Sequence, residues 1–277
     1  MKDRQILLAE RMSRQAHIDT RFVDPLWKGH VDVPLLEMSM AVPGQTPVIL
    51  LPEMRFKGLM RMVAECFSNC GKFMVVDTVN TRFEMLRHAL SKDEVSLYCS
   101  AQNLNALSYS DDVFSHLITE LSLTTLLKFS MILPEYARVL RPSGRMVFAV
   151  PYWGTFPAFF DLLDESLCKL SPQEDDMTDI REAMSDGRVR QVLGNNGLHV
   201  DGFEEVSFEL SFPSVEELLF STLVETNYLS YCLNYPVQYV EARQVLMLVV
   251  RAFHHYFQKD PVKVPFRMGL YSVTKAS

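Results

Sequence analysis

The sequence predicts an α/β fold, namely a three-layer, doubly wound sandwich around a mostly parallel sheet of seven strands. The first observation behind this prediction is a series of short apolar runs that alternate with longer segments whose apolar residues recur at helical spacing. Continuous apolar runs are typical of parallel strands that are covered on both faces. The second observation is that no repeat, low-complexity tract or Pro/Gly-rich linker divides the chain. Together these features favour one domain.

The N-terminal segment, residues 1–42, is predicted to be a helical lead-in to the main domain, residues 43–277. Its helical stretches are expected to break at Pro25 and Pro34, because proline removes a backbone donor and clashes with the preceding turn. We expect this segment to cover one edge or mouth of the main fold.

The first five strands follow from the apolar runs, which end at turn signals or where a helical pattern begins. They are predicted over Val48–Leu51, Phe73–Asp77, Val95–Cys99, Val113–Ile118 and Arg145–Val150. The turn Pro43-Gly44 precedes the first of them. Helices are predicted between the strands, over Phe56–Phe67, Thr78–Leu90 and Leu126–Leu140, the last closed by the turn Arg141–Gly144. Strand and helix alternation with right-handed crossovers gives the doubly wound arrangement.

The second half of the chain continues the pattern with added helices. Helices are predicted over Asp161–Leu170 and Asp179–Gly194, followed by a strand over Phe203–Leu210. Inserted helices are expected at about residues 214–257, over Val215–Asn227 and Val237–Phe257. The final strand, Val264–Thr274, is expected at the edge of the sheet.

Composition excludes several classes of protein. The net charge of -7 argues against a nucleic-acid partner, which requires clustered Lys and Arg. The cysteines number five and are too scattered for a zinc site, so we expect reduced thiols and no metal. The N-terminal sequence lacks the apolar core of a signal peptide, and no apolar run is long enough to span a membrane. These features predict a cytoplasmic protein.

Several motifs resemble a known family when their order and spacing are taken together. They are Val48–Leu51, Val75–Asp77, Ser110–Phe114, Glu135–Arg145 and Asn196–Leu198 with Phe203–Val206. The chain from about residue 43 onward resembles the class I S-adenosylmethionine-dependent methyltransferases, especially the branch that modifies small molecules, lipids or quinones. This resemblance implies a Rossmann-like methyltransferase fold and S-adenosylmethionine as the cofactor.

The sequence departs from this family at the loop that holds the cofactor. The family has an acidic residue and a G-x-G-x-G loop at the end of its first strand, because the backbone passes close to the cofactor there. The three glycine positions are occupied by Pro52, Met54 and Phe56 in this chain, and the acidic position by Leu50. The two larger side chains are expected to fill volume that the cofactor would need.

Five residues are the candidates for cofactor binding that the resemblance implies. Asp77, with Thr78 beside it, matches the acidic residue that takes the ribose hydroxyls, although both residues also suit the start of a helix. Glu53 is the acidic group near the altered loop, where it could hold the cofactor's amino group. Gln102 and Asn103 follow the third strand, where they could bind the adenine edge or simply be loop residues.

Other side chains allow a structural and a functional interpretation. His116 near the fourth strand is a candidate base, since histidine titrates near neutrality, or a structural histidine. The aromatic residues of 152–160 could form a packed lid over the core or line an apolar substrate pocket. The aromatic residues of the inserted helices could belong to the core or to a pairing surface.

Two functions therefore remain open. One is a non-catalytic, methyltransferase-like protein with a degenerate S-adenosylmethionine site, which acts as a structural or regulatory partner of another protein or of a second copy. The alternative is a divergent but active methyltransferase on a small, apolar or lipid-like molecule, in which Asp77 and Glu53 hold the cofactor and residues 152–160 line the acceptor pocket.

Overall fold

A single seven-stranded sheet forms the centre of the molecule, with strand order β3-β2-β1-β4-β5-β7-β6. The structure is a computed structural model and describes residues 2–40, 47–53, 57–67, 72–78, 83, 97–170, 178–233, 242–258 and 261–276. The strands are β1 (Val48–Pro52), β2 (Lys72–Asp77), β3 (Leu97–Ala101), β4 (Phe114–Glu120), β5 (Leu140–Pro151), β6 (Leu198–Phe212) and β7 (Val262–Lys275). The predicted α/β sandwich with a mostly parallel sheet is confirmed.

The last strand does not lie where the sequence suggested. The strands from β3 to β5 pair in parallel, whereas β7 pairs antiparallel with both β5 and β6. β7 therefore lies inside the sheet, and the expectation of an edge strand is wrong; β6 forms that edge. The run Val264–Thr274 is largely buried, as a strand with a neighbour on each side requires.

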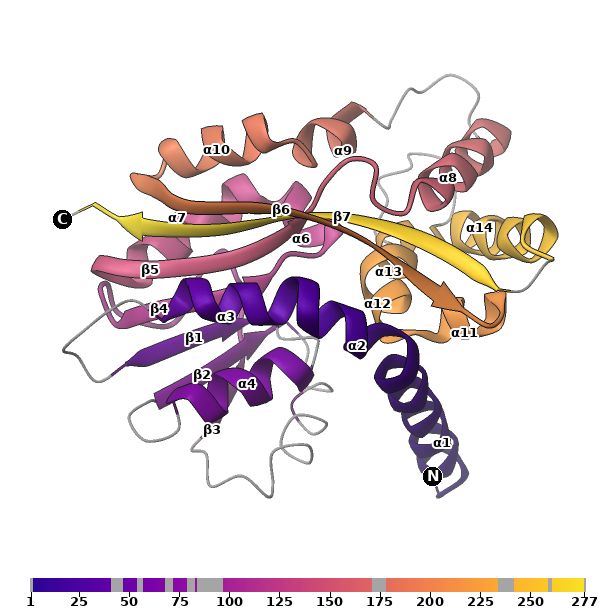
Figure 1. The fold of residues 1–277 in the computed structure, drawn as a ribbon, viewed down its shortest axis with the longest axis horizontal. Coiled ribbons are helices and arrows are strands. Elements are labelled where there is room, and N and C mark those ends of the chain that lie inside the picture. Colours follow the sequence, from indigo (N-terminus) through magenta and orange to yellow (C-terminus); the bar gives the residue numbers. More distant parts are fainter. Residues whose placement is uncertain are drawn as a thin grey trace.

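Helices cover both faces of the sheet (Figure 1). α3 (Val33–Ser39) and α4 (Lys57–Phe67) lie on one face, and α7 (Phe129–Val139) and α10 (Asp186–Gly194) on the other. A further group lies toward the carboxyl ends of the parallel strands, at the right of Figure 1. It comprises α8 (Pro157–Leu170), α11 (Val215–Phe220), α12 (Thr222–Val224), η3 (Glu225–Leu229), α13 (Ser230–Leu233) and α14 (Ala242–Tyr256).

The N-terminal segment stays helical through both prolines. α1 (Lys2–Ile18) leads into η1 (Asp19–Val23), α2 (Asp24–Trp27), η2 (Lys28–Asp32) and α3. The two η segments are π-helical and each precedes a proline, whose missing donor and bulky ring are accommodated by the wider turn. The expected breaks at Pro25 and Pro34 are therefore wrong. The division into segments 1–42 and 43–277 stays a prediction.

Local capping splits two helices that the sequence suggested were continuous. Ser122 caps α6 (Leu123–Leu127), which ends at Lys128 before α7 begins. Ser185 caps α10 and separates it from α9 (Thr178–Ala183). The expected turn at residues 141–144 lies within the early part of β5, where Ser143 has a φ of 59°.

Some predictions lie outside the described residues. They concern the turn Pro43-Gly44, the loop positions Met54 and Phe56, and nearly all of the helix predicted over Thr78–Leu90. The third strand is described from Leu97, so its predicted first residues also lie outside. In the described part of the chain, no helix is long and apolar enough to cross a membrane.

Candidate functional site

A polar cavity of about 320 Å³ lies at the carboxyl ends of the first four strands. Open parallel sheets bind ligands at this edge, and the volume lies at the lower end of the range for small-molecule sites. The cavity is lined by Glu53, Thr78, Asn103, Leu104, Asn105, Ser122, Thr124, Thr125, Lys128, Ile132, Thr226 and Ser230. We refer to it below as the polar cavity.

Glu53 lies at the end of β1 with a strained backbone. Its φ is 48°, a left-handed value that non-glycine residues seldom adopt, and its backbone N–H donates to the carbonyl of Val76 at 2.9 Å. The hydroxyl group of Thr125 donates to the Glu53 carboxylate. Thr119 donates to the carbonyl of Pro52 at 2.9 Å and fixes the same end of β1 against β4. The Glu53 side chain therefore already has a partner across the cavity wall.

Asp77 and Thr78 are placed differently although they are neighbours. Asp77 is 2% exposed and is not among the residues that line the polar cavity, whereas Thr78 is exposed and lines it. The hydroxyl group of Thr78 donates to the Asp77 carboxylate at 3.4 Å. The acidic side chain that the resemblance assigns to ribose binding is thus buried behind a neutral hydroxyl.

Gln102 and Asn103 also differ in placement, since the Gln102 side chain supports the loop and Asn103 lines the polar cavity. The Gln102 amide group donates to Ser100 at 3.1 Å and accepts from the backbone N–H of Ser108 at 2.8 Å, so this side chain supports the loop. Asn103 lines the polar cavity, and its carbonyl oxygen accepts from the backbone N–H of Asn105 at 3.0 Å. The structure brings together three of the five candidates: Glu53, Thr78 and Asn103.

The sequence interpretation missed the wall that β4 and η3 contribute. Ser122, Thr124 and Thr125 follow β4 directly, and Thr226 comes from η3. The hydroxyl-rich run after a buried strand was the available signal, because all parallel strands end at the same edge. The contribution of η3 depends on how the inserted helices fold back over the sheet, which local sequence does not reveal.

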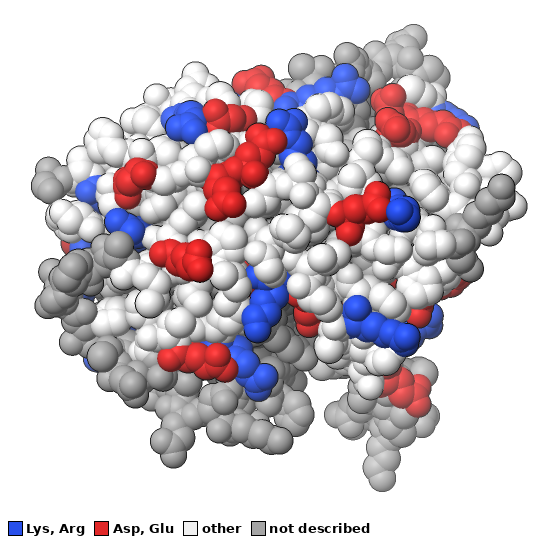
Figure 2. All heavy atoms as spheres, in the orientation of Figure 1, with Lys and Arg blue, Asp and Glu red and all other residues white. Residues whose placement is uncertain are grey.

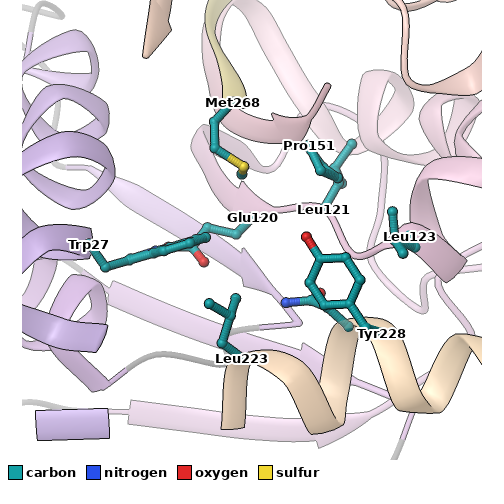
Figure 3. A pocket seen from close by; sticks show the side chains of 9 residues that line it. Trp27, Glu120, Leu121, Leu123, Pro151, Leu223, Tyr228 and Met268 are labelled. Carbon is teal, nitrogen blue, oxygen red and sulfur yellow. The ribbon is translucent and has the colours of Figure 1, made fainter. Parts of the chain in front are cut away.

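A second, smaller pocket is shown in Figure 3, and its lining residues Leu123 and Asn227 adjoin in sequence residues that line the polar cavity. Its volume of about 10 Å³ is room for roughly one water molecule. Trp27 and Tyr228 approach it from two sides, and Glu120 reaches it from the end of β4. The complete lining is Trp27, Glu120, Leu121, Leu123, Pro151, Leu223, Asn227, Tyr228 and Met268. We call it the Trp27 pocket.

The aromatic segment after β5 packs as a lid over the core. Phe156, Phe159 and Phe160 are buried and surround Tyr228, with ring centroids 5.0, 5.1 and 6.4 Å from it. No residue of 152–160 lines the polar cavity or the Trp27 pocket. The expectation that this segment forms an apolar substrate pocket is therefore wrong for the two cavities described.

The aromatic residues of the inserted helices also belong mostly to the core. Tyr228, Tyr231 and Phe253 are buried, and Tyr256 is exposed. Tyr235 and Tyr239 lie outside the described residues. The pairing surface that the sequence suggested cannot use the three buried rings.

His116 is a structural histidine. It lies near the beginning of β4, paired with Ile49 and Arg145, and thus away from the carboxyl ends where the polar cavity lies. Its Nδ1 forms a hydrogen bond of 2.9 Å with Ser115, and its ring packs against Phe67. Burial and the nearby charge of Arg145 lower the pKa of His116 to about 4. Of the two interpretations that the sequence allows, these contacts support the structural histidine.

A further charged or metal-binding site would be indicated by the visible surface charge or by grouped acidic, histidine and cysteine side chains. Acidic and basic side chains are interspersed on the face seen in Figure 2. Over the described ranges, no group of three or more His, Cys, Asp and Glu side chains could hold a metal ion.

Comparison with known proteins identifies the fold. No protein-family model and no curated protein sequence matches the chain. A candidate methyltransferase from Bacillus halodurans C-125 is similar in structure, with a TM-score of 0.56 and 12% identity over 89% of this chain and 99% of that one. The chain therefore has the fold of the class I S-adenosylmethionine-dependent methyltransferases.

Two further solved structures are similar to this chain and are named for different reactions. Geranyl diphosphate C-methyltransferase from Streptomyces coelicolor A3(2), solved with Mg²⁺, geranyl diphosphate and S-adenosyl-L-homocysteine, has a TM-score of 0.50 and 11% identity over 88% of this chain and 78% of that one. The [4+2]-cyclase SpnF has a TM-score of 0.51 and 13% identity over 88% of this chain and 80% of that one. Proteins with this fold are thus named for different reactions, so the fold by itself does not assign an activity.

Proposed function

We propose that this chain is a non-catalytic, methyltransferase-like protein with a degenerate S-adenosylmethionine site, and that its role is structural or regulatory. The observation that carries the proposal is at the end of β1. Glycine is replaced there by Pro52, and the neighbouring Glu53 carboxylate is bound by Thr125. Proline holds φ near -65° and removes a donor, so the backbone cannot form the family's close contact with the cofactor.

The residues present do not fit the cofactor in the family's manner. Asp77 is buried behind Thr78, Leu50 is apolar, and the position after β3 carries amides in place of a carboxylate. The acidic side chains with which the family binds the ribose, the methionine amino group and the adenine are thus either buried or replaced in this chain. We derive no methyl-transfer step for this chain.

The space for an acceptor supports the same proposal. Methyl transfer requires a cofactor and an acceptor in line, hence two adjoining volumes. The Trp27 pocket, whose lining residues Leu123 and Asn227 adjoin those of the polar cavity in sequence, has room for about one water-sized group. The polar cavity remains suited to a small polar ligand, because hydroxyl, amide and charged side chains line it.

We further propose that the role is exercised through a protein partner or a second copy of the chain. Leu233 on α13 and Met247 and Tyr256 on α14 are each at least 45% exposed, and α13 packs against α14. Contiguous exposed apolar side chains are typical of contact surfaces. Because Met247 and Tyr256 lie nine positions apart on α14, and hence on opposite sides of it, only one of them can share a contact surface with Leu233.

Restoration of the loop tests the proposal by gain of function. The triple variant Pro52→Gly, Met54→Gly and Phe56→Gly returns glycine to the three family positions. We expect it to bind S-adenosylmethionine at least about tenfold more tightly than the unmodified chain, measured by calorimetric titration. The matched control replaces the same residues by alanine, which removes bulk but not the conformational restriction. Micromolar binding by the unmodified chain, equal to that of the glycine variant, would sink the idea.

A second candidate function is a divergent, active methyltransferase on a small molecule. One observation favours it: Glu53, Thr78 and Asn103, from the ends of three neighbouring strands, line a single cavity of about 320 Å³. If this function holds, the unmodified chain binds the cofactor, and Asn103→Ala weakens that binding.

A further inference from the structure

The Trp27 pocket holds one buried negative centre in mostly apolar surroundings. Glu120 is the only charged residue in its described lining and is 6% exposed. The indole N–H of Trp27 donates to Glu120 Oε1 at 3.3 Å. Burial of a carboxylate costs free energy unless a cation or several hydrogen-bond donors compensate its charge. The partners of Glu120 therefore indicate whether a ligand is needed to balance it.

A second carboxyl group lies behind Glu120. Asp32, at the end of η2, is 3% exposed and forms a side-chain hydrogen bond with Glu120. Burial, together with the nearby charge of Asp24, raises the pKa of Asp32 to about 6, against the opposing effects of the Glu120 hydrogen bond and Lys28. Asp32 is therefore protonated below about pH 6, and there the two hydrogen-bonded carboxyl groups together carry one negative charge.

One oxygen of this pair lacks a partner. Asp32 Oδ1 is buried without a hydrogen-bond partner among the described residues. Fully buried polar atoms are almost always paired, so each exception calls for an explanation. Asp32 does not line the Trp27 pocket, so the pair's negative charge reaches the pocket through the Glu120 carboxylate.

We propose that the Trp27 pocket binds the ammonium group of a small amine, with the Glu120–Asp32 pair as its counter-ion. An ammonium group carries three donors. Three lining residues, Glu120, Asn227 and Tyr228, carry oxygen acceptors, and Figure 3 shows the Tyr228 hydroxyl group directed toward the enclosed space. The volume of about 10 Å³ suits a water-sized head group.

The fold around the pocket supports this assignment. Asn227 and Tyr228 belong to η3, a π-helical turn, and such turns are frequent at functional sites. The N-terminal helix that carries Trp27 is held to the inserted helices by Arg11 and Gln15, which donate to Glu225.

The test uses the full chain and ammonium chloride as the probe. Potassium chloride at the same concentration is the control, because K⁺ is close to ammonium in size but has no N–H donors. We expect ammonium to raise the unfolding midpoint above its value in potassium chloride, by about 3 °C when its concentration is roughly tenfold above the dissociation constant. Equal midpoints in the two salts would overturn the proposal and leave a buried water as the occupant.

Variants locate the effect. Glu120→Gln is expected to abolish the difference between the two salts, whereas Glu204→Gln, the same change at an exposed position of β6, retains it. If the Glu120→Gln chain does not fold, Asn227→Leu serves as the second variant and is expected to weaken ammonium binding about tenfold. A full ammonium response in either pocket variant would contradict the proposal. The polar cavity is a separate site, so this proposal and the proposed function fail independently.

Discussion

Gly269→Ala is expected to lower the free energy of unfolding by about 3 kcal/mol, the upper part of the usual range for an overpacked core. Gly269 lies in β7 between Val150 of β5 and Glu205 of β6. A Cβ atom at this position would lie 2.5 Å from Cζ of Tyr152 and 2.7 Å from its hydroxyl oxygen. Either the ring or the strand must therefore move.

Tyr152 cannot move away at low cost. It is 3% exposed, and its hydroxyl group is hydrogen-bonded to that of Tyr271 and donates to Asp186 at 3.2 Å. Displacement of the ring would break these contacts in a buried site, which adds to the steric cost.

Urea unfolding of the unmodified chain and of the Gly269→Ala variant measures the difference in their free energies of unfolding. Gly187→Ala is the matched control, because its added Cβ has no heavy atom within 4 Å and Gly187 lies in the first turn of α10. Alanine is expected to be neutral there or to stabilise by up to about 1 kcal/mol. If the urea midpoint of the Gly269→Ala variant is unchanged, Gly269 of β7 does not pack closely against the Tyr152 ring.

Trp27→Ala is expected to destabilise the chain by about 3–5 kcal/mol, as complete truncation of a buried tryptophan does. Trp27 is 3% exposed, and its ring makes edge contacts with Phe208 and Phe266 at centroid distances of 5.6 and 5.7 Å. Its indole N–H also donates to Glu120. The substitution would leave a cavity and remove a donor from a buried carboxylate.

The neighbouring position provides the control for this variant. Leu26 precedes Trp27 in α2 but is 40% exposed, so Leu26→Ala is expected to change the unfolding free energy by less than about 1 kcal/mol. Thermal and urea unfolding of both variants give the comparison. If the two substitutions cost the same, the N-terminal helix is not anchored through Trp27.

Much of the fold could be predicted from apolar runs alone. Strands β1 and β2 are covered on both faces, so the runs Val48–Leu51 and Phe73–Val76 are continuously apolar and end at Pro52 and Asp77. The position of β7 within the sheet could not be predicted in this way. The sequence of Val264–Thr274 predicts a strand but does not indicate which strands it pairs with. The helix break at Ser185 depends on a capping hydrogen bond, in which the Ser185 side chain accepts from the backbone N–H of Arg188, and such a bond has no effect on the spacing of apolar residues in the sequence.

The candidate site was partly predictable for a related reason. Glu53, Thr78 and Asn103 follow successive parallel strands, so their approach at one edge follows from topology. Their part in cofactor binding stays a prediction. The approach of Trp27 to Glu120 joins residues 93 positions apart and results from the packing of the N-terminal helix, for which the sequence has no local signal.

Calorimetric titration of the unmodified chain with S-adenosylmethionine and S-adenosylhomocysteine tests the central claim most directly. The proposed degenerate site predicts no saturable heat with either compound at millimolar concentration, and no rise of the unfolding midpoint. Saturable, micromolar binding that Asn103→Ala weakens would contradict the claim and establish the polar cavity as a working cofactor site.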